Sequence, residues 1–447
     1  MVWRDPGAAN LVCDSNWRTI TIRGRLTMAA PLRRHDIRAV MKSLRPGITV
    51  FVPGMSGESL AFYEQFCGDR ERAAGITFVG VHFPGINCTD YLGLHPEARL
   101  RAYFMSPSVR SGIMRGRVDL IPLDYPGIVR ELEQGIAVDM AIAQVAPPDE
   151  NGRCSLGACQ DFLPSVWRNA GLRIAHVNPR LPRTHGSFSI SLGDCDFIFE
   201  RDWDIPMLAA DVPDSVTLQH AGLVANLVPD GATLQLGIGR LQTAILMSLK
   251  NHRRLRVYSG MVSSAVMELL DGGVIQGDGA IECGVALGDS EFYARLDSDP
   301  VFYFRPSRET HDIRRIASIT DFCAINSALE VDLFGQVNVD YLNGRLVAGV
   351  GGLPAFSAGA RLAPGGRSII VVPSTAEGGR RSRIVCPEHH SLSALGRHEA
   401  DYVVTEHGVA QLRGLSVHDR AKALISIAAP EFQDGLARAW GEIERKL

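Results

Sequence analysis

The sequence lacks closely paired cysteines, long apolar runs and a large excess of charge of either sign. Nine cysteines are scattered over 447 residues, and their odd number and wide spacing argue against a disulfide framework. The closest pair, Cys154 and Cys159, has neither a Cys-x-x-Cys motif nor a spaced pair of histidines beside it. We therefore expect no metal site and a reducing, cytoplasmic location.

No apolar run reaches the roughly 18 residues that a membrane helix needs, and residues 1–6 do not begin a secretion signal. The formal net charge is only -3, and basic clusters such as residues 252–254 and 380–383 are short. We interpret them as solvated surface or, alternatively, as phosphate contacts. We expect no nucleic-acid partner and no membrane partner.

The size and composition indicate a globular protein with two domains. Hydrophobic residues make up 46% of the chain and charged residues 21%, which is typical of an ordinary globular protein. A chain of this length usually divides into two cores. Charge and proline concentrate around residues 200–214, so we predict an N-terminal domain over residues 1–205 and a C-terminal domain over 206–447.

Short apolar segments alternate with helical patterns along the whole chain, which is typical of parallel strands joined by crossover helices. The sequence therefore predicts an α/β protein. The predicted strands cover residues 49–52, 76–81, 137–145, 174–177, 233–236, 255–258, 368–372 and 401–405. The predicted helices cover residues 60–67, 107–115, 215–228 and 241–249.

Two glycine clusters are candidates for ligand contact. Gly237 and Gly239 follow a predicted strand and precede a helix, where the backbone can approach an anion at the helix N-terminus. A second cluster at residues 349–352 includes Gly351 and Gly352 and suits a pantetheine arm or an acyl carbonyl. A plain tight turn in the first case, and a plain loop in the second, are the alternatives.

Several longer segments resemble one known family. Residues 135–157 carry VDMAIAQVAPPDENGRCSLG, and residues 177–184 read VNPRLPRT. Residues 230–239 read DGATLQLGIG, and residues 324–337 read AINSALEVDLFGQV. These segments, in this order, resemble acetyl-CoA hydrolases and 4-hydroxybutyrate or acetate CoA-transferases. The resemblance implies two Rossmann-like open parallel-sheet domains of the CoA-transferase fold, with the active site between them, commonly in a homodimer.

The family's transferases use a glutamate that attacks acyl-CoA and forms a glutamyl-CoA thioester. The segment that resembles the glutamate motif is YSGMVSSA at residues 258–265, which has Gly260 at the glutamate position. Glycine has no side chain that could act as a nucleophile. We therefore predict that the chain lacks the family's catalytic carboxylate.

Other positions of the expected pocket differ in the same way. Arg240 stands where the family has a glycine, and Leu353 and Ala355 stand where it has a glutamine and an aspartate. Arg240 would pair with a ligand carboxylate or phosphate, or else extend into solvent. The resemblance implies a substrate or coenzyme A site, whose expected residues are Gly237, Gly239, Arg240, Gly351, Gly352 and Asn326.

Three further side chains are candidates for catalysis. Glu58 lies in a Ser-Gly-Glu segment that resembles the family's Gly-Glu-Pro, and Glu406 lies in a segment that resembles Val-Thr-Glu. His407 replaces a tyrosine of the family and could act as a general base near neutral pH. A capping or salt-bridged structural carboxylate is the alternative for each glutamate.

The leading hypothesis is an enzyme that transfers or rearranges an acyl group from a CoA or carrier-protein thioester, without a glutamyl-CoA intermediate. Specialised metabolism would be a suitable setting for it. One alternative is an ordinary CoA-transferase or acyl-CoA hydrolase that uses another carboxylate, such as Glu282 or Glu58. Another is a thioester-binding partner subunit without activity.

Overall fold

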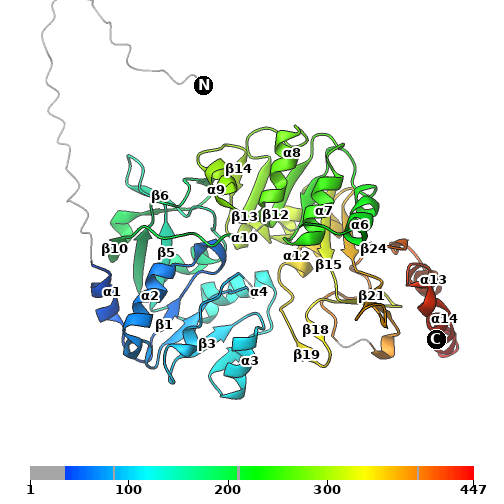
Figure 1. Cartoon of the computed structure of the whole chain (residues 1–447), viewed down its shortest axis with the longest axis horizontal. Helices are drawn as coiled ribbons and strands as arrows, with labels where there is room; N and C mark the ends of the chain where they lie inside the picture. The colour runs from blue at the N-terminus through cyan, green and yellow to red at the C-terminus, as the bar shows by residue number, and fades with distance from the viewer. Residues whose placement is uncertain (1–35, 84–85, 209–211, 390–391) are drawn as a thin grey trace, which may run out of the picture. The chain divides into compact units, whose positions relative to one another are not determined.

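The computed structural model describes residues 36–83, 86–208, 212–389 and 392–447 (Figure 1). The expectation for residues 1–6 lies outside these ranges. Two large sheets dominate the described part. The first has seven parallel strands, and their order is β10-β7-β5-β1-β2-β3-β4. These strands are β1 (Thr49–Phe51), β2 (Thr77–Val79), β3 (Arg99–Ala102), β4 (Val118–Leu120), β5 (Met140–Val145), β7 (Leu172–Val177) and β10 (Phe197–Glu200).

The second sheet has nine strands in the order β25-β24-β20-β15-β11-β12-β13-β14-β8. All neighbours are parallel except β24 and β25. Its strands are β8 (His185–Gly186), β11 (Thr233–Gln235), β12 (Arg256–Ser263), β13 (Ile281–Leu287), β14 (Phe302–Phe304), β15 (Phe322–Ser327), β20 (Arg367–Val371), β24 (Tyr402–Thr405) and β25 (Gly408–Gln411). Strand β8 lies in this sheet although it precedes residue 205.

Both strand orders contain a point at which the chain reverses direction across the sheet. In the second sheet the chain runs from β11 through β12, β13 and β14 on one side, and then returns to β15 on the other side of β11. The first sheet does the same around β1 and β5. The carboxyl ends of the strands at such a switch point form a crevice in which α/β proteins bind ligands.

The described helices come from both halves of the chain. Those of the first half are α1 (Ile37–Ser43), α2 (Leu60–Gly68), α3 (Pro107–Met114), α4 (Tyr125–Arg130) and α5 (Leu163–Trp167), together with the short 3-10 turn η1 (Met55–Gly57). Those of the second half are α6 (Ser215–Ala225), α7 (Arg240–Ser248), α8 (Met267–Asp271), α9 (Ser290–Leu296), α10 (Ser307–Thr310), α11 (Ile313–Ala317), α12 (Leu353–Leu362), α13 (Val417–Ser426) and α14 (Pro430–Glu444).

Several short paired strands complete the described part. They are β6 (Arg153–Ser155) with β9 (Ser189–Ser191), β16 (Glu330–Asp332) with β17 (Val337–Asn338) and β23 (Ile384–Val385), β18 (Tyr341–Leu342) with β19 (Arg345–Leu346), and β21 (Thr375–Ala376) with β22 (Arg381–Ser382).

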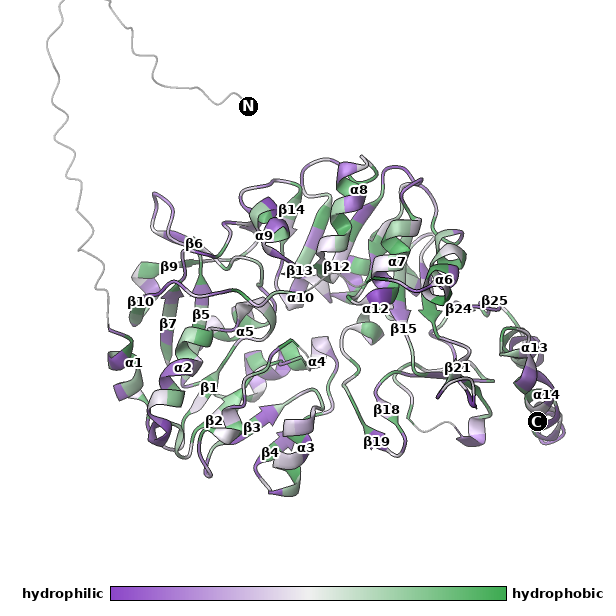
Figure 2. Cartoon of the chain, in the orientation of Figure 1, coloured by the Kyte–Doolittle hydropathy of each residue, from purple (hydrophilic) through white to green (hydrophobic). Residues whose placement is uncertain are grey.

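The apolar residues of the second sheet form separate cores on its two faces. Helices α6 to α9 pack on one face, where Leu234 and Val257 are buried. Helices α11 and α12 pack on the other, where Tyr258 contacts Phe322 and Phe356. Figure 2 shows α2 and α7 with both hydrophobic and hydrophilic residues, as expected for helices that cover a sheet.

The structure confirms the predicted α/β class and its large parallel sheets. One predicted boundary is wrong in a way that concerns the site: the strand expected over residues 255–258 continues as β12 to Ser263. It continues because β13 supplies a partner through Ser263, which pairs with Leu287. Gly260 therefore lies within a strand and not in a turn.

Segments of the first half bind directly to β13 of the second sheet. The Gln160 N–H donates to the Gly284 carbonyl oxygen at 2.9 Å, and the Ala286 N–H donates to the Ala158 carbonyl oxygen at 2.8 Å. The hydroxyl of Ser56, in η1, donates to the Ala286 carbonyl oxygen at 3.1 Å. The carboxyl end of β13 is therefore covered by backbone from the first half.

Within the described ranges, no helix has the length and apolar character needed to cross a membrane.

The close approach of β12 and β13 gives a test of the fold. A Cβ at Gly284 would stand 2.9 Å from the Gly260 carbonyl oxygen, and both groups belong to paired strands. We expect Gly284→Ala to lower the free energy of unfolding by about 1–3 kcal/mol. Gly435→Ala is the control, because its Cβ meets nothing within 4 Å and it lies inside α14. This change should add about 0.5–1 kcal/mol. Urea unfolding of both variants measures the difference, and equal stabilities would contradict the assigned register.

Candidate functional site

The glycine turn after β11 lies at the switch point of the second sheet. Gly239 has a φ of 107°, which favours glycine, and it is the N-cap of α7. A Cβ at Gly237 or Gly239 would meet only the Gln242 side chain, at 3.8 Å or more. The backbone of this turn is therefore open to a ligand beside the N-terminus of a helix.

Amide side chains support the same edge of the sheet. Asn326, in β15, donates to the Gln235 Oε1 atom at 2.9 Å, and Gln235 donates back to the Asn326 Oδ1 atom at 3.3 Å. Gln242 of α7 donates to the Ser327 hydroxyl oxygen at 3.1 Å. The structure thus brings predicted residues Gly237, Gly239 and Asn326 to one edge.

Gly260 lies next to this turn, on the neighbouring strand. The hydroxyl of Ser259 donates to the Leu236 carbonyl oxygen at 2.6 Å, and so joins the end of β11 to β12. Ser259 pairs with Cys283 and Met261 pairs with Val285, which places Gly284 opposite Gly260. Two adjacent strands therefore lack side chains at the same level of the sheet.

The imidazole of His311 fills the space beside Gly260. A Cβ added at Gly260 would stand 2.9 Å from the His311 Cε1 atom and 3.1 Å from Nε2. A Cβ added at Gly352 would stand 2.4 Å from the same Nε2 atom. The two glycines therefore approach one imidazole, and neither position has room for a larger residue unless the ring moves.

Aromatic rings hold His311 on its other sides. Its ring centroid lies 4.2 Å from that of Tyr125, in α4, and 4.6 Å from that of Phe356, in α12. Its Nδ1 atom lies 2.9 Å from the Thr310 hydroxyl oxygen. Burial lowers the pKa of His311 to about 3, although the Ser307 carbonyl opposes the effect. The imidazole is therefore neutral at pH 7.

The second glycine cluster packs against the first half of the chain. The Tyr125 N–H donates to the Gly351 carbonyl oxygen at 3.4 Å, and the Met105 N–H donates to the Ala348 carbonyl oxygen at 3.2 Å. Gly352 is the N-cap of α12, which starts at Leu353. The structure thus brings Gly351 and Gly352 to the same site as Gly260.

Glu58 is buried in the first half and its carboxylate accepts three side-chain hydrogen bonds. The donors are Thr89 at 2.6 Å, Asn87 at 2.8 Å and Tyr91 at 3.1 Å. Burial, together with the charge of Glu58, raises the pKa of Tyr91 well above its usual value. These contacts suit a structural carboxylate, and the catalytic role of Glu58 stays a prediction.

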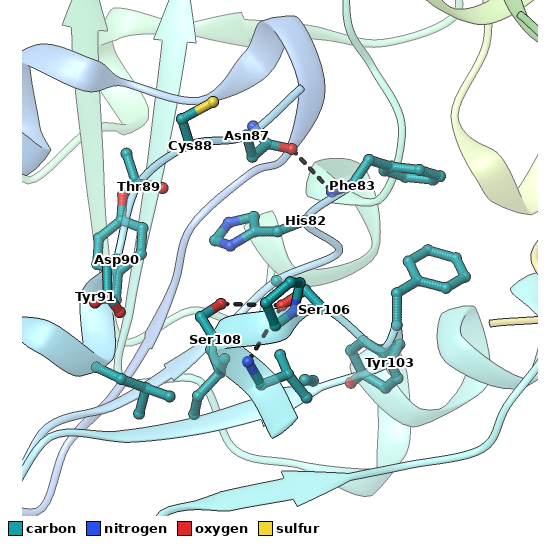
Figure 3. Close-up of a pocket in the computed structure, with 17 residues that line it drawn as sticks. His82, Phe83, Asn87, Cys88, Thr89, Asp90, Tyr91, Tyr103, Ser106 and Ser108 are labelled. Carbon is teal, nitrogen blue, oxygen red and sulfur yellow. Dashed lines mark hydrogen bonds between the residues drawn. The ribbon is translucent and has the colours of Figure 1, made fainter. Parts of the chain in front are cut away.

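The donors to Glu58 also line a pocket of about 300 Å³ next to the start of α3 (Figure 3). Ser106 caps α3 through a 3.2 Å hydrogen bond from the Val109 N–H, and His82 stacks on Tyr91 with ring centroids 5.6 Å apart. Phe83 and Phe104 line the pocket on another side. All residues that line this pocket lie in the first half of the chain, between Gly80 and Val109.

Glu406 and His407 follow β24, four strands away from β12. At the usual strand spacing this is a separation of about 19 Å. Glu406 accepts hydrogen bonds from the backbone and hydroxyl of Ser374 and lies 3.1 Å from His220 Nε2. These hydrogen bonds outweigh burial and lower the pKa of Glu406. The structure does not bring Glu406 or His407 next to Gly260, and their catalytic roles stay predictions.

Arg240 is the first residue of α7 and its guanidinium is exposed. Its Nη1 atom lies 3.3 Å from the Asp214 Oδ2 atom. Both interpretations of Arg240, as a contact for a ligand anion and as a solvent-exposed side chain, therefore remain open. An exposed ion pair of this kind is weak, so a ligand anion could replace Asp214.

Glu282 lies in β13 opposite Tyr258, so it shares a face of the sheet with Gly260. Its carboxylate pairs with Arg305 and lies 3.9 Å from Arg315. Arg305 also pairs with Glu309, at 2.9 Å. Glu282 is therefore part of a network of alternating charges.

Asp161 is a buried carboxyl group near the same site. Its Oδ1 atom accepts a 2.6 Å hydrogen bond from the Ser307 hydroxyl, which is four residues before His311. Burial raises the pKa of Asp161 to about 7 against the effect of this hydrogen bond. Burial, together with the charge of Asp161, raises the pKa of Tyr125 well above its usual value.

Sequence patterns did not indicate His311 or Asp161. Each is an isolated polar residue without a motif, and only the fold shows that each is buried beside Tyr125. In the described part of the chain, no three side chains of His, Cys, Asp or Glu gather as a metal site.

The comparisons with known proteins agree with the geometry. Residues 77–208 match the acetyl-CoA hydrolase/transferase N-terminal domain, and residues 288–440 match the C-terminal domain of the same family. The chain is 34% identical to the 4-hydroxybutyrate coenzyme A transferase of Clostridium kluyveri over 413 residues, which are 89% of this chain and 95% of that protein. The chain belongs to the acetyl-CoA hydrolase/transferase family.

Other known proteins are similar over most of the chain. The butyryl-CoA:acetate CoA-transferase of Anaerostipes caccae is 34% identical over 358 residues, 75% of this chain and 79% of that protein. The structure of RipA from Yersinia pestis is 27% identical, with a TM-score of 0.82, and covers 92% of this chain and 100% of its own. The 4-hydroxybutyrate CoA-transferase of Porphyromonas gingivalis is 29% identical, with a TM-score of 0.75, over 92% of this chain and 97% of its own.

A pH series tests the environment of Asp161. Because its folded pKa of about 7 lies above the unfolded value of 3.8, the folded protein binds the extra proton between these values. Its contribution to stability is complete below pH 4 and is lost as the pH rises to 7. We expect Asp161→Asn to gain stability relative to the wild type over this range, by up to about 1.4 kcal/mol per pH unit. Urea unfolding from pH 4 to 8 measures the difference, and a difference independent of pH would contradict the assignment.

A double-mutant cycle tests the contact between Gly260 and His311. Gly260→Glu alone should destabilise the fold by about 1–3 kcal/mol, because the new side chain overlaps the imidazole. In the His311→Ala background the same change should cost less, with a favourable coupling of about 0.5–3 kcal/mol. Unfolding of the four proteins gives the coupling. Additive changes would show that residue 260 has free space beside it.

Proposed function

We propose that this protein transfers the acyl group of an acyl-CoA directly to an acceptor, without a glutamyl-CoA intermediate. The names of its relatives, which include CoA-transferases and an acetyl-CoA hydrolase, support an acyl-CoA substrate. The direct transfer is the new element. Its acceptor would approach from the open turn at Gly237 and Gly239, because the His311 ring fills the space beside Gly260.

The observation that carries this proposal is the closed space at residue 260. A glycine there supplies no nucleophile, and the His311 ring lies within 2.9 Å of the place where any side chain would start. Sequence and packing therefore support the same conclusion. The wall of the site at this point consists of glycine backbone and a neutral imidazole.

Backbone donors remain available to the thioester oxygen. The open turn at Gly237 and Gly239 precedes α7, and Gly352 precedes α12, so each offers N–H groups at a helix N-terminus. A donor that is aimed at a developing oxyanion contributes about 3 kcal/mol to catalysis. Such stabilisation needs no carboxylate.

An ordinary CoA-transferase mechanism is the second candidate, and the position of Glu282 favours it. This carboxylate shares a face of the sheet with Gly260 and is partly exposed. Against this role, Arg305 and Arg315 already hold it in ion pairs. We also propose, from the family resemblance, that the protein is a cytoplasmic homodimer.

A trapping experiment distinguishes the two mechanisms. The protein is incubated with acetyl-CoA, treated with borohydride or hydroxylamine, and digested for mass spectrometry of its carboxylates. We expect every carboxylate to remain unmodified, while free CoA is released when water or an amine is offered as the acceptor. Reduction or hydroxamate formation at Glu282 or Glu58, lost in Glu282→Ala or Glu58→Ala, would establish the ordinary mechanism.

The same assay tests for a subunit without activity. The proposed transfer would be contradicted if CoA bound in calorimetry but acetyl-CoA was not consumed with any acceptor.

A further inference from the structure

The pocket of about 300 Å³ beside the start of α3 takes no part in the proposed transfer. This volume is at the lower end of the range for small-molecule sites. Cys88, Asp90 and Ser108 line the pocket and are exposed, so a ligand can enter it from solvent. The pocket therefore has the size and the access that a short organic molecule needs.

Aromatic rings form much of the pocket wall, and they come from two segments of the chain (Figure 3). His82 and Tyr91 stack with their ring centroids 5.6 Å apart, and the centroids of Phe83 and Phe104 lie 4.7 Å apart. Tyr103 is the fifth ring. The face of an aromatic ring carries partial negative charge and attracts cations, including quaternary ammonium groups. A wall of this kind favours a cation that also has apolar surface.

The carboxylates at this pocket have no cationic partner in its wall. The 17 described residues that line it include Asp90 but no lysine or arginine. Asp90 accepts a hydrogen bond from the Gly93 N–H at 3.0 Å. Behind the wall, Glu58 is only 1% exposed, and its three side-chain donors are neutral residues that all line the pocket. The field of these two carboxylates therefore attracts a cation into the pocket.

Tyr91 links the buried charge to the pocket. Its hydroxyl donates to the Glu58 Oε1 atom at 3.1 Å, and its ring lines the pocket. Hydrogen bonds polarise the groups that they join, so a phenol that donates to a carboxylate carries more negative charge on its ring. The attraction of this ring for a cation increases accordingly.

The N-terminus of α3 does not favour an anion here. Its N-cap Ser106 accepts the Val109 N–H at 3.2 Å, and Pro107, which comes first in the helix, has no N–H. The helix end is therefore largely satisfied by its own residues. The charges of Glu58 and Asp90 remain the main electrostatic feature of the pocket.

We propose that this pocket binds an organic ammonium group, a positively charged nitrogen that carries methyl or methylene groups. The rings contact the apolar surface of such a group, and the charges of Glu58 and Asp90 balance its nitrogen. A phosphate would not suit the site, because it needs cationic partners. The proposal does not depend on the proposed acyl transfer, because binding alone tests it.

Three probes of nearly the same shape test the preference for positive charge. Choline carries the cationic nitrogen, neohexyl alcohol has a carbon atom in its place, and the anion of tert-butylacetic acid has the opposite charge. Each is titrated into the full chain at a fixed ionic strength of about 0.1 M, and ligand-observed NMR gives the dissociation constants. We expect choline to bind at least about fivefold more tightly than neohexyl alcohol, and the anion to bind most weakly.

Two substitutions locate the bound cation. Asp90→Asn keeps the shape of the rim and removes its charge, and Glu58→Gln removes the buried charge. Each should weaken choline binding about three- to tenfold and leave the affinity for neohexyl alcohol unchanged, which a collapsed pocket would not do. Glu97→Gln is the control and should change neither affinity, because Glu97 is exposed and does not line the pocket. If Glu58→Gln fails to fold, Asp90→Asn decides the outcome.

Equal affinities for choline and neohexyl alcohol, tighter binding of the anion, or no binding of choline would overturn the proposal. A choline affinity that both substitutions leave unchanged would also overturn it, because the cation would then lie elsewhere on the protein.

Discussion

The packing of the His311 ring against two glycines is the constraint around which the site is built. A Cβ at Gly260 or Gly352 would lie within about 3 Å of this ring, so the two glycines and the imidazole require one another. The ring also packs at tilted angles against Tyr125 and Phe356, which come from opposite halves of the chain. Changes at any of these positions therefore affect both the site and the contact between the halves.

The chemistry of the site follows from this packing. A transferase of the family requires a free carboxylate at attack distance, and glycine backbone provides none. The carboxylates near the two sheets are already engaged: Glu58 by three donors, Glu282 by arginines, and Asp161 by Ser307. What remains is a set of backbone donors at a switch point and a neutral imidazole. These contacts are the basis on which we propose direct transfer in place of covalent capture of the acyl group.

The sequence predicted the architecture well because its strands are short apolar segments that end at proline or glycine. The strand at Thr49–Phe51 and the helix at Pro107–Met114 lie where apolar spacing placed them. The same signals missed strands such as Phe302–Phe304, which are brief and have no such pattern. Local spacing also could not show that β12 continues through Gly260, because the pairing with β13 decides its length.

Within the site, motifs located the glycine turns and Asn326, but not His311, whose side chain fills the space beside Gly260. His311 belongs to no motif. Its position against Gly260 depends on tertiary contacts with residues up to 186 positions away, such as Tyr125. The most direct measurement is a crystal structure with bound CoA. The account predicts the CoA sulfur beside the open turn at Gly237 and Gly239, with no carboxylate oxygen within about 4 Å of it. A carboxylate oxygen of Glu282 or Glu58 in contact with the sulfur, and the imidazole turned away, would contradict it.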